Sequence, residues 1–254
     1  MYVLINPLVV FLFFTQQPAP SQPLSLKRFE VLRSTPDGMR RLPPPMRAIF
    51  SDPNSDGEPV SNLETAAKRA GFTPRMLKSP SVTQFGVIDS FTRDVTLNVS
   101  DLTDALREAK ATDVTVPSAW NGLVVKLHQD AGVLTDYGDF FIIQAPPLTL
   151  SGPSGFPMDQ FMEVLFRIVG ISSPDAHTLR EGFAKEPASF VFIPTQYDMD
   201  NRQVQVTGGQ GLILQNAEKG GELAFMWSTA ERSYFLFGLL TEADAIAAAN
   251  ALAP

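Results

Sequence analysis

The sequence predicts an α+β fold in which a curved antiparallel β-sheet carries helices packed on one face. Segments that alternate apolar and polar residues, as half-buried strands do, fill much of 83–145 and 189–240. Segments with apolar residues at helical spacing occur at 61–71, 101–111, 157–171, 173–186 and 242–252. Strands that follow one another in runs, with helices grouped between and after them, are typical of the α+β class.

Each expected helix has a recognisable beginning or end. Ser61 followed by Glu64 forms a capping-box pattern, and Gly71 stands where a helix commonly ends. Pro157 and Gly170 flank the central amphipathic helix in the same way. The expected N-caps of the three other helices are Ser100, Ser173 and Thr241.

Three glycine-containing segments are expected to be turns and not catalytic loops. The segment 129–132, QDAG, is predicted to be a hairpin turn between two strands. TGGQGL at 207–212 also lies between strands, whereas a phosphate-binding loop opens into a helix, so a hairpin turn with a positive φ is expected. In SGPSGF at 151–156, Ser154 lacks the flanking glycines of a nucleophile elbow, so a turn before the helix is expected.

The composition excludes several classes of function. The formal net charge is -7 and the sequence contains no cysteine. Nucleic-acid-binding surfaces require clustered positive charge, which an acidic balance of this size disfavours. Without cysteine there are no disulfides, thiolate metal sites or cysteine nucleophiles.

The first 14 residues are predicted to be a truncated membrane anchor or signal-like segment. The run from Tyr2 to Phe14 is almost entirely apolar but shorter than the ~20 residues of a spanning helix. A buried N-terminal strand or core helix is the alternative. The basic residues that follow the run, with none before it, conflict with export under the positive-inside rule. They are Lys27, Arg28, Arg33, Arg40, Arg41 and Arg47.

Residues 15–59 are predicted to be a Pro-rich linker that leads into an extracytoplasmic α+β domain at 60–254. The segment holds nine prolines, including Pro43-Pro44-Pro45, and few aromatic residues. Such a composition favours an extended, semi-rigid chain. The expected organisation is therefore a domain held away from a membrane.

The two histidines are expected to be solvated or structural. His128 lies at the end of a predicted strand, and His177 lies on a predicted surface helix. They are far apart in the sequence, and no metal-ligand partner is expected four residues after either one.

A calcium loop is the sharpest local pattern, although it is incomplete. Asp52, Asn54, Asp56 and Gly57 match the first half of such a loop, where oxygens at alternate positions surround a cation. The twelfth position is Leu63, and a glutamate follows one residue too late. A polar turn before a capped helix is therefore expected instead.

The remaining carboxylates carry no recognisable catalytic spacing. Asp136, Asp139 and Glu163 are the candidates for a hydrolase, but their spacing does not support that function. Asp198 and Asp200 fail as metal ligands because an arginine occupies the third position. We therefore expect no catalytic, cofactor-binding or metal-ligating residues, no cofactor and no enzymatic activity, and the sequence does not name a ligand-binding residue.

Aromatic residues on strands and on one helix predict either a core or the lining of a concave sheet. A lipid- or peptide-binding cavity is the functional alternative. These residues are Phe140, Phe141, Phe161, Phe166, Phe190, Phe192, Phe225, Trp227, Phe235 and Phe237.

The C-terminal half resembles a known, uncharacterised domain family. The ending runs from Trp227 through a turn to YFLFG at 234–238 and a helix at 242–252. Upstream, VPSAWNG, GVLTDYGDFFIIQ and VQVTGGQGLIL follow in the family's order. Together these motifs, over 114–252, resemble the extracytoplasmic C-terminal domain of bacterial anti-sigma factors and related membrane-anchored proteins.

The resemblance implies an exported, membrane-tethered α+β domain that is not an enzyme. The helical segment 157–186 departs from the pattern as an insertion, and no sigma-binding module is recognisable, so anti-sigma function is not transferred. The expected function is a sensory or interaction domain that binds an unknown protein or small molecule, with no nucleic acid. The alternative is a periplasmic lipid or lipoprotein carrier with a cavity on the curved sheet.

Overall fold

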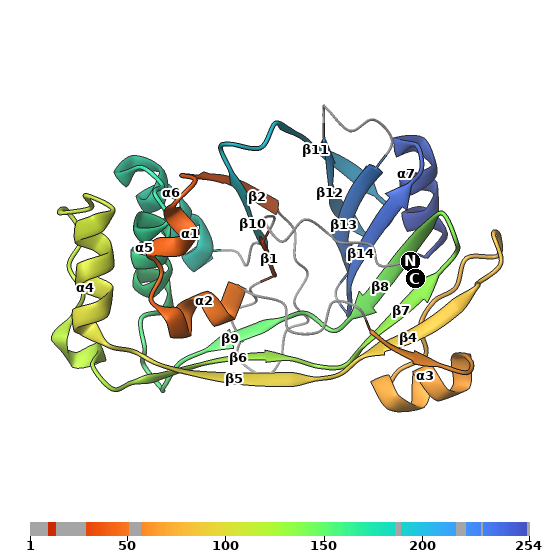
Figure 1. The fold of residues 1–254 in the computed structure, drawn as a ribbon, viewed down its shortest axis with the longest axis horizontal. Helices are drawn as coiled ribbons and strands as arrows, with labels where there is room; N and C mark the ends of the chain where they lie inside the picture. The colour runs from red at the N-terminus through yellow and green to blue at the C-terminus, as the bar shows by residue number, and fades with distance from the viewer. Residues whose placement is uncertain are drawn as a thin grey trace.

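The structure, a computed structural model, confirms the α+β class (Figure 1). It describes residues 10–13, 29–50, 57–185, 189–216, 222–229 and 231–252. Most strand pairs are antiparallel, and the strands form three sheets.

The large sheet has the strand order β11-β12-β13-β14-β8-β7-β4-β3, and all neighbouring strands run antiparallel. Its strands are β3 (Glu58–Val60), β4 (Gln84–Ile88), β7 (Gly132–Asp136), β8 (Phe140–Ala145), β11 (Met199–Val206), β12 (Gly209–Asn216), β13 (Glu222–Ser228) and β14 (Ser233–Leu239).

The large sheet continues into a second sheet, which is a long three-stranded ribbon (Figure 1). The second sheet has the order β5-β6-β9, with β5 (Phe91–Thr96), β6 (Val124–Gln129) and β9 (Thr149–Ser151). The chain passes almost directly from β4 into β5, from β6 into β7 and from β8 into β9.

The expected hairpin at 129–132 is therefore wrong. β6 pairs with β5 and β9, whereas β7 pairs with β4 and β8, so 129–132 joins two stretches of one long strand. A Cβ at Gly132 would lie 3.1 Å from the Cβ of Ala145 on the neighbouring strand. Gly132 thus permits the close approach of two neighbouring strands. A glycine in this role is hard to distinguish from a turn glycine by its local sequence.

The predicted linker is also wrong where the structure describes it, because 29–50 and 57–59 belong to the fold. They form β2 (Phe29–Ser34), α1 (Gly38–Arg41), α2 (Pro44–Phe50) and the start of β3. The side chains of Leu32, Leu42 and Met46 are buried in the main core. Proline is favourable in the first turn of a helix, so the prolines begin α2 instead of extending the chain.

Part of the apolar N-terminal run is a strand. β1 (Val10–Phe13) pairs antiparallel with β10 (Ser189–Pro194), and β10 pairs parallel with β2 to complete a third sheet. This outcome matches the strand alternative for the run. In the parts of the chain that the structure describes, no helix has the length and apolar character needed to cross a membrane.

Two helices cover the same face of the large sheet. Ala66 of α3 (Leu63–Ala70) packs on Val87 and Val133. The face continues through the register Val133–Gln144–Tyr234–Trp227 to α7 (Glu242–Ala251), whose alanines pack there.

Three helices form the other end of the molecule and pack with the second sheet (Figure 1). They are α4 (Val99–Glu108), α5 (Met158–Ile168) and α6 (Ser173–Lys185), and the 3-10 turn η1 (Ser118–Trp120) lies between α4 and β6. β10 separates two cores because its side chains alternate. Phe190 and Phe192 pack with the helices, whereas Val191 and Ile193 pack on the large sheet.

Three of the helix caps, those of α3, α4 and α6, lie one or two residues before or after the predicted position. Thr241 caps α7 as predicted, by accepting from the backbone N–H of Asp244. Asn62 and Asn98 cap α3 and α4 instead of Ser61 and Ser100. Ser172, not Ser173, accepts from the N–H of Asp175 at the start of α6. Asparagine and serine are both good caps, so adjacent candidates are hard to rank from sequence.

Candidate functional site

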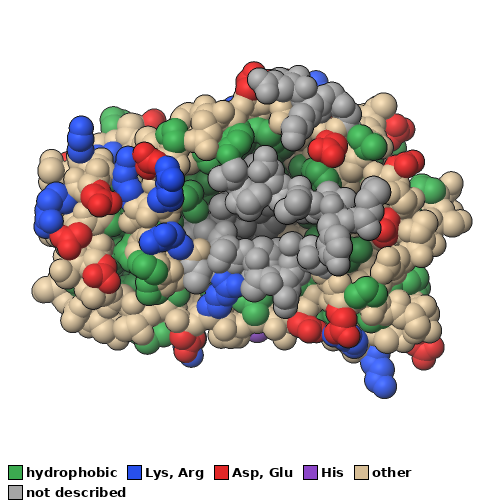
Figure 2. Space-filling model, in the orientation of Figure 1, with side chains coloured by type: hydrophobic (Ala, Val, Ile, Leu, Met, Phe, Trp, Pro, Cys, Tyr) green, Lys and Arg blue, Asp and Glu red, His purple; other side chains and the backbone are tan. Residues whose placement is uncertain are grey.

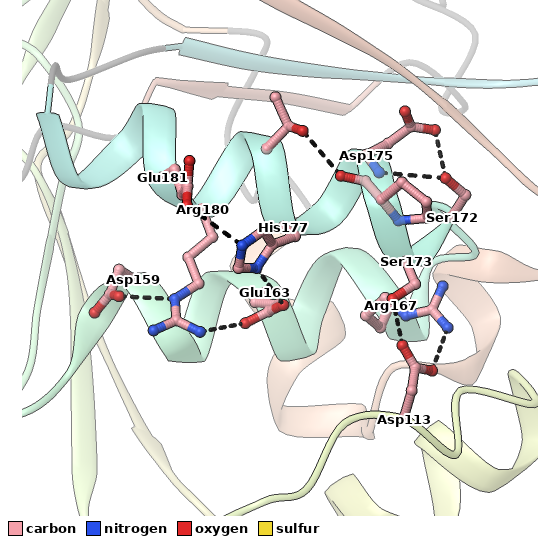
Figure 3. A network of polar contacts seen from close by, with 12 residues as sticks. Asp113, Asp159, Glu163, Arg167, Ser172, Ser173, Asp175, His177, Arg180 and Glu181 are labelled. Atoms are coloured by element: carbon pink, nitrogen blue, oxygen red, sulfur yellow. Dashed lines mark hydrogen bonds and ion pairs between the residues drawn. The ribbon is translucent and has the colours of Figure 1, made fainter.

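A network of polar contacts lies between α5 and α6 (Figure 3). α5 is amphipathic and buries Phe161, Leu165 and Phe166 completely or nearly so, which leaves its polar residues on the opposite side. Asp159, Glu163 and Arg167 recur at a spacing of four and therefore form one polar stripe. This stripe faces α6.

Arg180 of α6 joins two carboxylates of that stripe. Its Nε donates to Oδ2 of Asp159 at 2.9 Å, and its Nη1 donates to Oε2 of Glu163 at 2.8 Å. The hydrogen bond that Arg180 donates to Glu163, followed by the one that it donates to Asp159, raises the pKa of the Arg180 guanidinium. The guanidinium is thus a cation that pairs with both carboxylates.

His177 lies beside this ion pair. Its Nε2 is 3.3 Å from Oε1 of Glu181, and its Nδ1 is 3.8 Å from Oε1 of Glu163. Its side chain is 60% exposed, in agreement with the expectation of a solvated histidine. The partner Glu181 stands four residues further on, a spacing visible in the sequence that sequence reasoning missed.

A second part of the network fixes α5 and α6 to the segment before η1. Asp113 accepts from Nη2 of Arg167 at 2.7 Å and from the hydroxyl of Ser173. Arg167 also donates to the carbonyl of Ile171 at 2.5 Å. The hydrogen bond from Ser173, with that from Arg167, lowers the pKa of Asp113 to about 2. The network therefore connects the neighbouring helices α5 and α6 with a segment that lies more than 50 residues earlier in the sequence.

We expect the Asp113→Asn variant to lose stability in a pH-dependent way. The folded-state pKa is about 2 and the ordinary value is 3.8, so the charged carboxylate stabilises the folded state. That contribution is fully present above the ordinary value and is lost as the pH falls through the folded-state value. The difference in unfolding free energy between wild type and Asp113→Asn should therefore shrink between about pH 4 and pH 2.

Urea unfolding of both proteins across this pH range measures the difference. Ser173→Ala removes the largest cause of the pKa shift and should reproduce part of the pH-dependent loss. A difference that is constant from neutral pH to pH 2 would contradict the expectation.

His128 joins a different chain of polar contacts, on the second sheet. The hydroxyl of Thr92 lies 2.8 Å from its Nδ1, and Oδ1 of Asp130 lies 3.1 Å from its Nε2. A hydrolytic triad also joins a hydroxyl, an imidazole and a carboxylate, but there the hydroxyl contacts Nε2 and the carboxylate contacts Nδ1, the reverse of the contacts here. Thr92 and His128 are opposite each other on β5 and β6, so these contacts also tie the two strands together.

The predicted carboxylate candidates do not form one site. Asp136 and Asp139 belong to the β7–β8 hairpin, where Asp136 accepts from the N–H of Gly138 at 2.7 Å. Glu163 lies on α5, at the opposite end of the view in Figure 1. Among the described residues, no group of three or more His, Cys, Asp or Glu residues is placed to hold a metal ion.

The other predicted turns and ligands have clear outcomes where they are described. Thr207 and Gly208 form the tip of the β11–β12 hairpin, with Gly208 at φ 90° as expected. Ser154 lies in the turn before α5, where the N–H of Phe156 donates to the carbonyl of Pro153. The calcium candidates Asp52, Asn54 and Asp56 lie outside the described residues.

The aromatic residues divide into a buried group and a half-buried group. Phe161, Phe166, Phe190, Phe192, Phe225 and Trp227 are at most 1% exposed and form cores. Phe141, Phe235 and Phe237 are half-buried on the opposite face of the large sheet from α7, with ring centroids 5.9–6.4 Å apart. We call these three residues the aromatic ladder.

Charged side chains of both signs mix at the helical end of the molecule on the face that Figure 2 shows.

Comparison of the sequence with protein-family models and with curated proteins, and of the fold with solved structures, finds no match.

Proposed function

We propose that this protein is a non-enzymatic sensory or interaction domain that works outside the cytoplasm. The observation that carries the proposal is that the ionisable groups around α5 and α6 are paired with one another. Arg180 is held by Asp159 and Glu163, and Asp113 is held by Arg167 and Ser173, so these groups fix helices to one another. A regulatory role is expected because the motifs at 114–252 resemble the extracytoplasmic domain of bacterial anti-sigma factors.

The location outside the cytoplasm rests on that resemblance and not on a helical anchor, since Val10–Phe13 pair within a sheet. A reporter enzyme that is active only outside the cytoplasm, fused after Pro254, tests it directly. We expect activity from the stably expressed fusion, with and without any upstream in-frame extension of the reading frame. Inactivity of both fusions, with a cytoplasmic reporter active at the same position, would contradict the location.

A carrier of lipids or lipoproteins is the second candidate, and the aromatic ladder favours it. Phe141, Phe235 and Phe237 place three half-buried rings side by side on the large sheet, where Phe235 and Phe237 pack against the core that contains Val191 and Met226. An apolar, aromatic lining of this kind suits an acyl chain. Native mass spectrometry of the purified protein distinguishes the two functions. A copurified lipid that is lost in Phe141→Ser but kept in the control Phe85→Ser would support the carrier.

A further inference from the structure

The edge of the large sheet formed by β11 is long, regular and polar. Its eight residues pair with β12 without interruption of the register, from Met199↔Asn216 to Val206↔Gly209. Within the described ranges, β12 is the strand neighbour of β11, which ends the sheet. Asp200, Asn201, Arg202, Gln203 and Gln205 are exposed.

The hairpin turn determines which backbone groups of β11 point outward. Val206 and Gly209 close a two-residue turn, and the closing pair of such a hairpin is hydrogen-bonded. The residues of β11 that form backbone hydrogen bonds with β12 are then Val206 and every second residue before it, namely Val204, Arg202 and Asp200. The N–H and C=O groups of Asn201, Gln203 and Gln205 therefore point away from β12.

Within the described residues, this edge has few of the usual protections against pairing. Edge strands are commonly shielded by proline, charged side chains, bulges or short length, and of these β11 has only the charges of Asp200 and Arg202. At the N-terminal end of β11, a side chain of the same chain already occupies an outward backbone carbonyl. The Nη2 of Arg33 donates to the carbonyl of Met199 at 2.7 Å, so the free edge begins after that residue.

We propose that this free edge pairs, antiparallel, with the same edge of a second copy of the chain. The side-chain amide of Gln203 donates to the carbonyl of Phe29 in the same chain at 2.8 Å. Asn201 and Gln205 carry amide side chains that both donate and accept hydrogen bonds, so these two positions are complementary to each other across a two-fold axis. The charges of the strand do not oppose this arrangement. Arg202 is paired with Glu242 of α7, and Asp200 lies on the same side of the strand as Arg202.

The position of the two-fold axis follows from the same groups. An axis at Gln203 pairs Gln203 with its own copy and Asn201 with Gln205 of the second copy, which uses the outward groups of all three. An axis at Arg202 would place two arginines directly opposite each other, which is unfavourable. An axis at Asn201 would require the carbonyl of Met199, which Arg33 already occupies. The isologous interface of such a dimer joins two large sheets into one.

Proline placement tests the proposal because β11 alternates between inward and outward N–H groups. Gln205→Pro removes an outward N–H that β12 does not use, so the fold should persist while dimerisation is lost. Gln205→Thr keeps the N–H and is the matched control. Light scattering after size exclusion, over a concentration series of the full chain, should show a dimer for wild type and Gln205→Thr and a monomer for Gln205→Pro.

A cysteine cross-link gives a second readout that does not depend on the proline variant folding. The natural chain has no cysteine, so a single introduced thiol reports on one position. Across the proposed axis the two Cα atoms of residue 203 lie ~5.5 Å apart, within disulfide range. Gln203→Cys should form a covalent dimer under mild oxidation, whereas Gln215→Cys, exposed on β12, should not.

Three results would overturn the proposal. They are a wild-type monomer at all concentrations, a dimer that survives in folded Gln205→Pro, and equal cross-linking of the two cysteine variants. None of them bears on the proposed function, which the reporter fusion tests separately.

Discussion

Replacing Trp227 with alanine is expected to lower the free energy of unfolding by about 3–5 kcal/mol, the usual cost of removing a large buried aromatic side chain. Trp227 is 1% exposed. Its ring stacks on Tyr234 with centroids 4.8 Å apart and an angle of 5°, and Phe225 lies 5.0 Å away on its own strand. The core that these rings form also contains the alanines of α7, so α7 should loosen as well.

Chemical denaturation of wild type and Trp227→Ala measures the loss. Leu239→Ala is the control, because Leu239 is 60% exposed on the neighbouring strand and its truncation should change stability by less than about 0.5 kcal/mol. A loss below about 1 kcal/mol for Trp227→Ala, the size of an average substitution, would show that this core does not hold the sheet and α7 together.

Gln144→Met should cost about 2–6 kcal/mol, because it leaves two backbone groups without partners at about 1–3 kcal/mol each. Gln144 is fully buried on β8. Its Oε1 accepts from the N–H of Arg75 at 2.9 Å, and its Nε2 donates to the carbonyl of Arg75 at 2.6 Å. The side-chain amide of Gln144 thus makes the two hydrogen bonds with the backbone of Arg75 that the backbone of a neighbouring strand would otherwise make. Methionine fills a similar volume but makes neither bond.

The local effect of Gln144→Met separates this explanation from a general loss of packing. We expect the amide of Arg75 to exchange its hydrogen much faster, while amides of β12 and β13 change only as global stability requires. Gln84→Met, at an exposed position of β4, is the matched control. Unchanged protection of the Arg75 amide would contradict the role given to Gln144.

Local patterns predicted the elements that interact mainly with their sequence neighbours. The strands at 132–145 and 209–239 form meanders, and the helix at 157–170 has an apolar stripe wide enough to recognise. The fold of 29–50 was missed because its evidence is not local. β2 is specified by parallel pairing with β10, which lies more than half the chain away, and proline content gave the opposite indication.

The site could be predicted only in part, for the same reason. The stripe of Asp159, Glu163 and Arg167 and the spacing of His177 and Glu181 are visible on single helices. The contacts of Arg180 with α5 and of Asp113 with Ser173 depend on how α5 and α6 pack. Gln144 was seen only as the end of a strand, and its partner Arg75 lies in a segment with no periodic pattern.

The parallel pairing of β2 with β10 also sets an order of events during synthesis. Phe29 is opposite Ser189, so a nascent chain must grow by roughly 160 residues before β2 can find its partner. At synthesis rates of about 5–20 residues per second, that interval is on the order of ten seconds or more. Throughout it, Phe29 and Leu32, both buried in the finished fold, lack the core that later covers them. We therefore expect the segment around β2 to benefit from chaperone protection while the protein is being made.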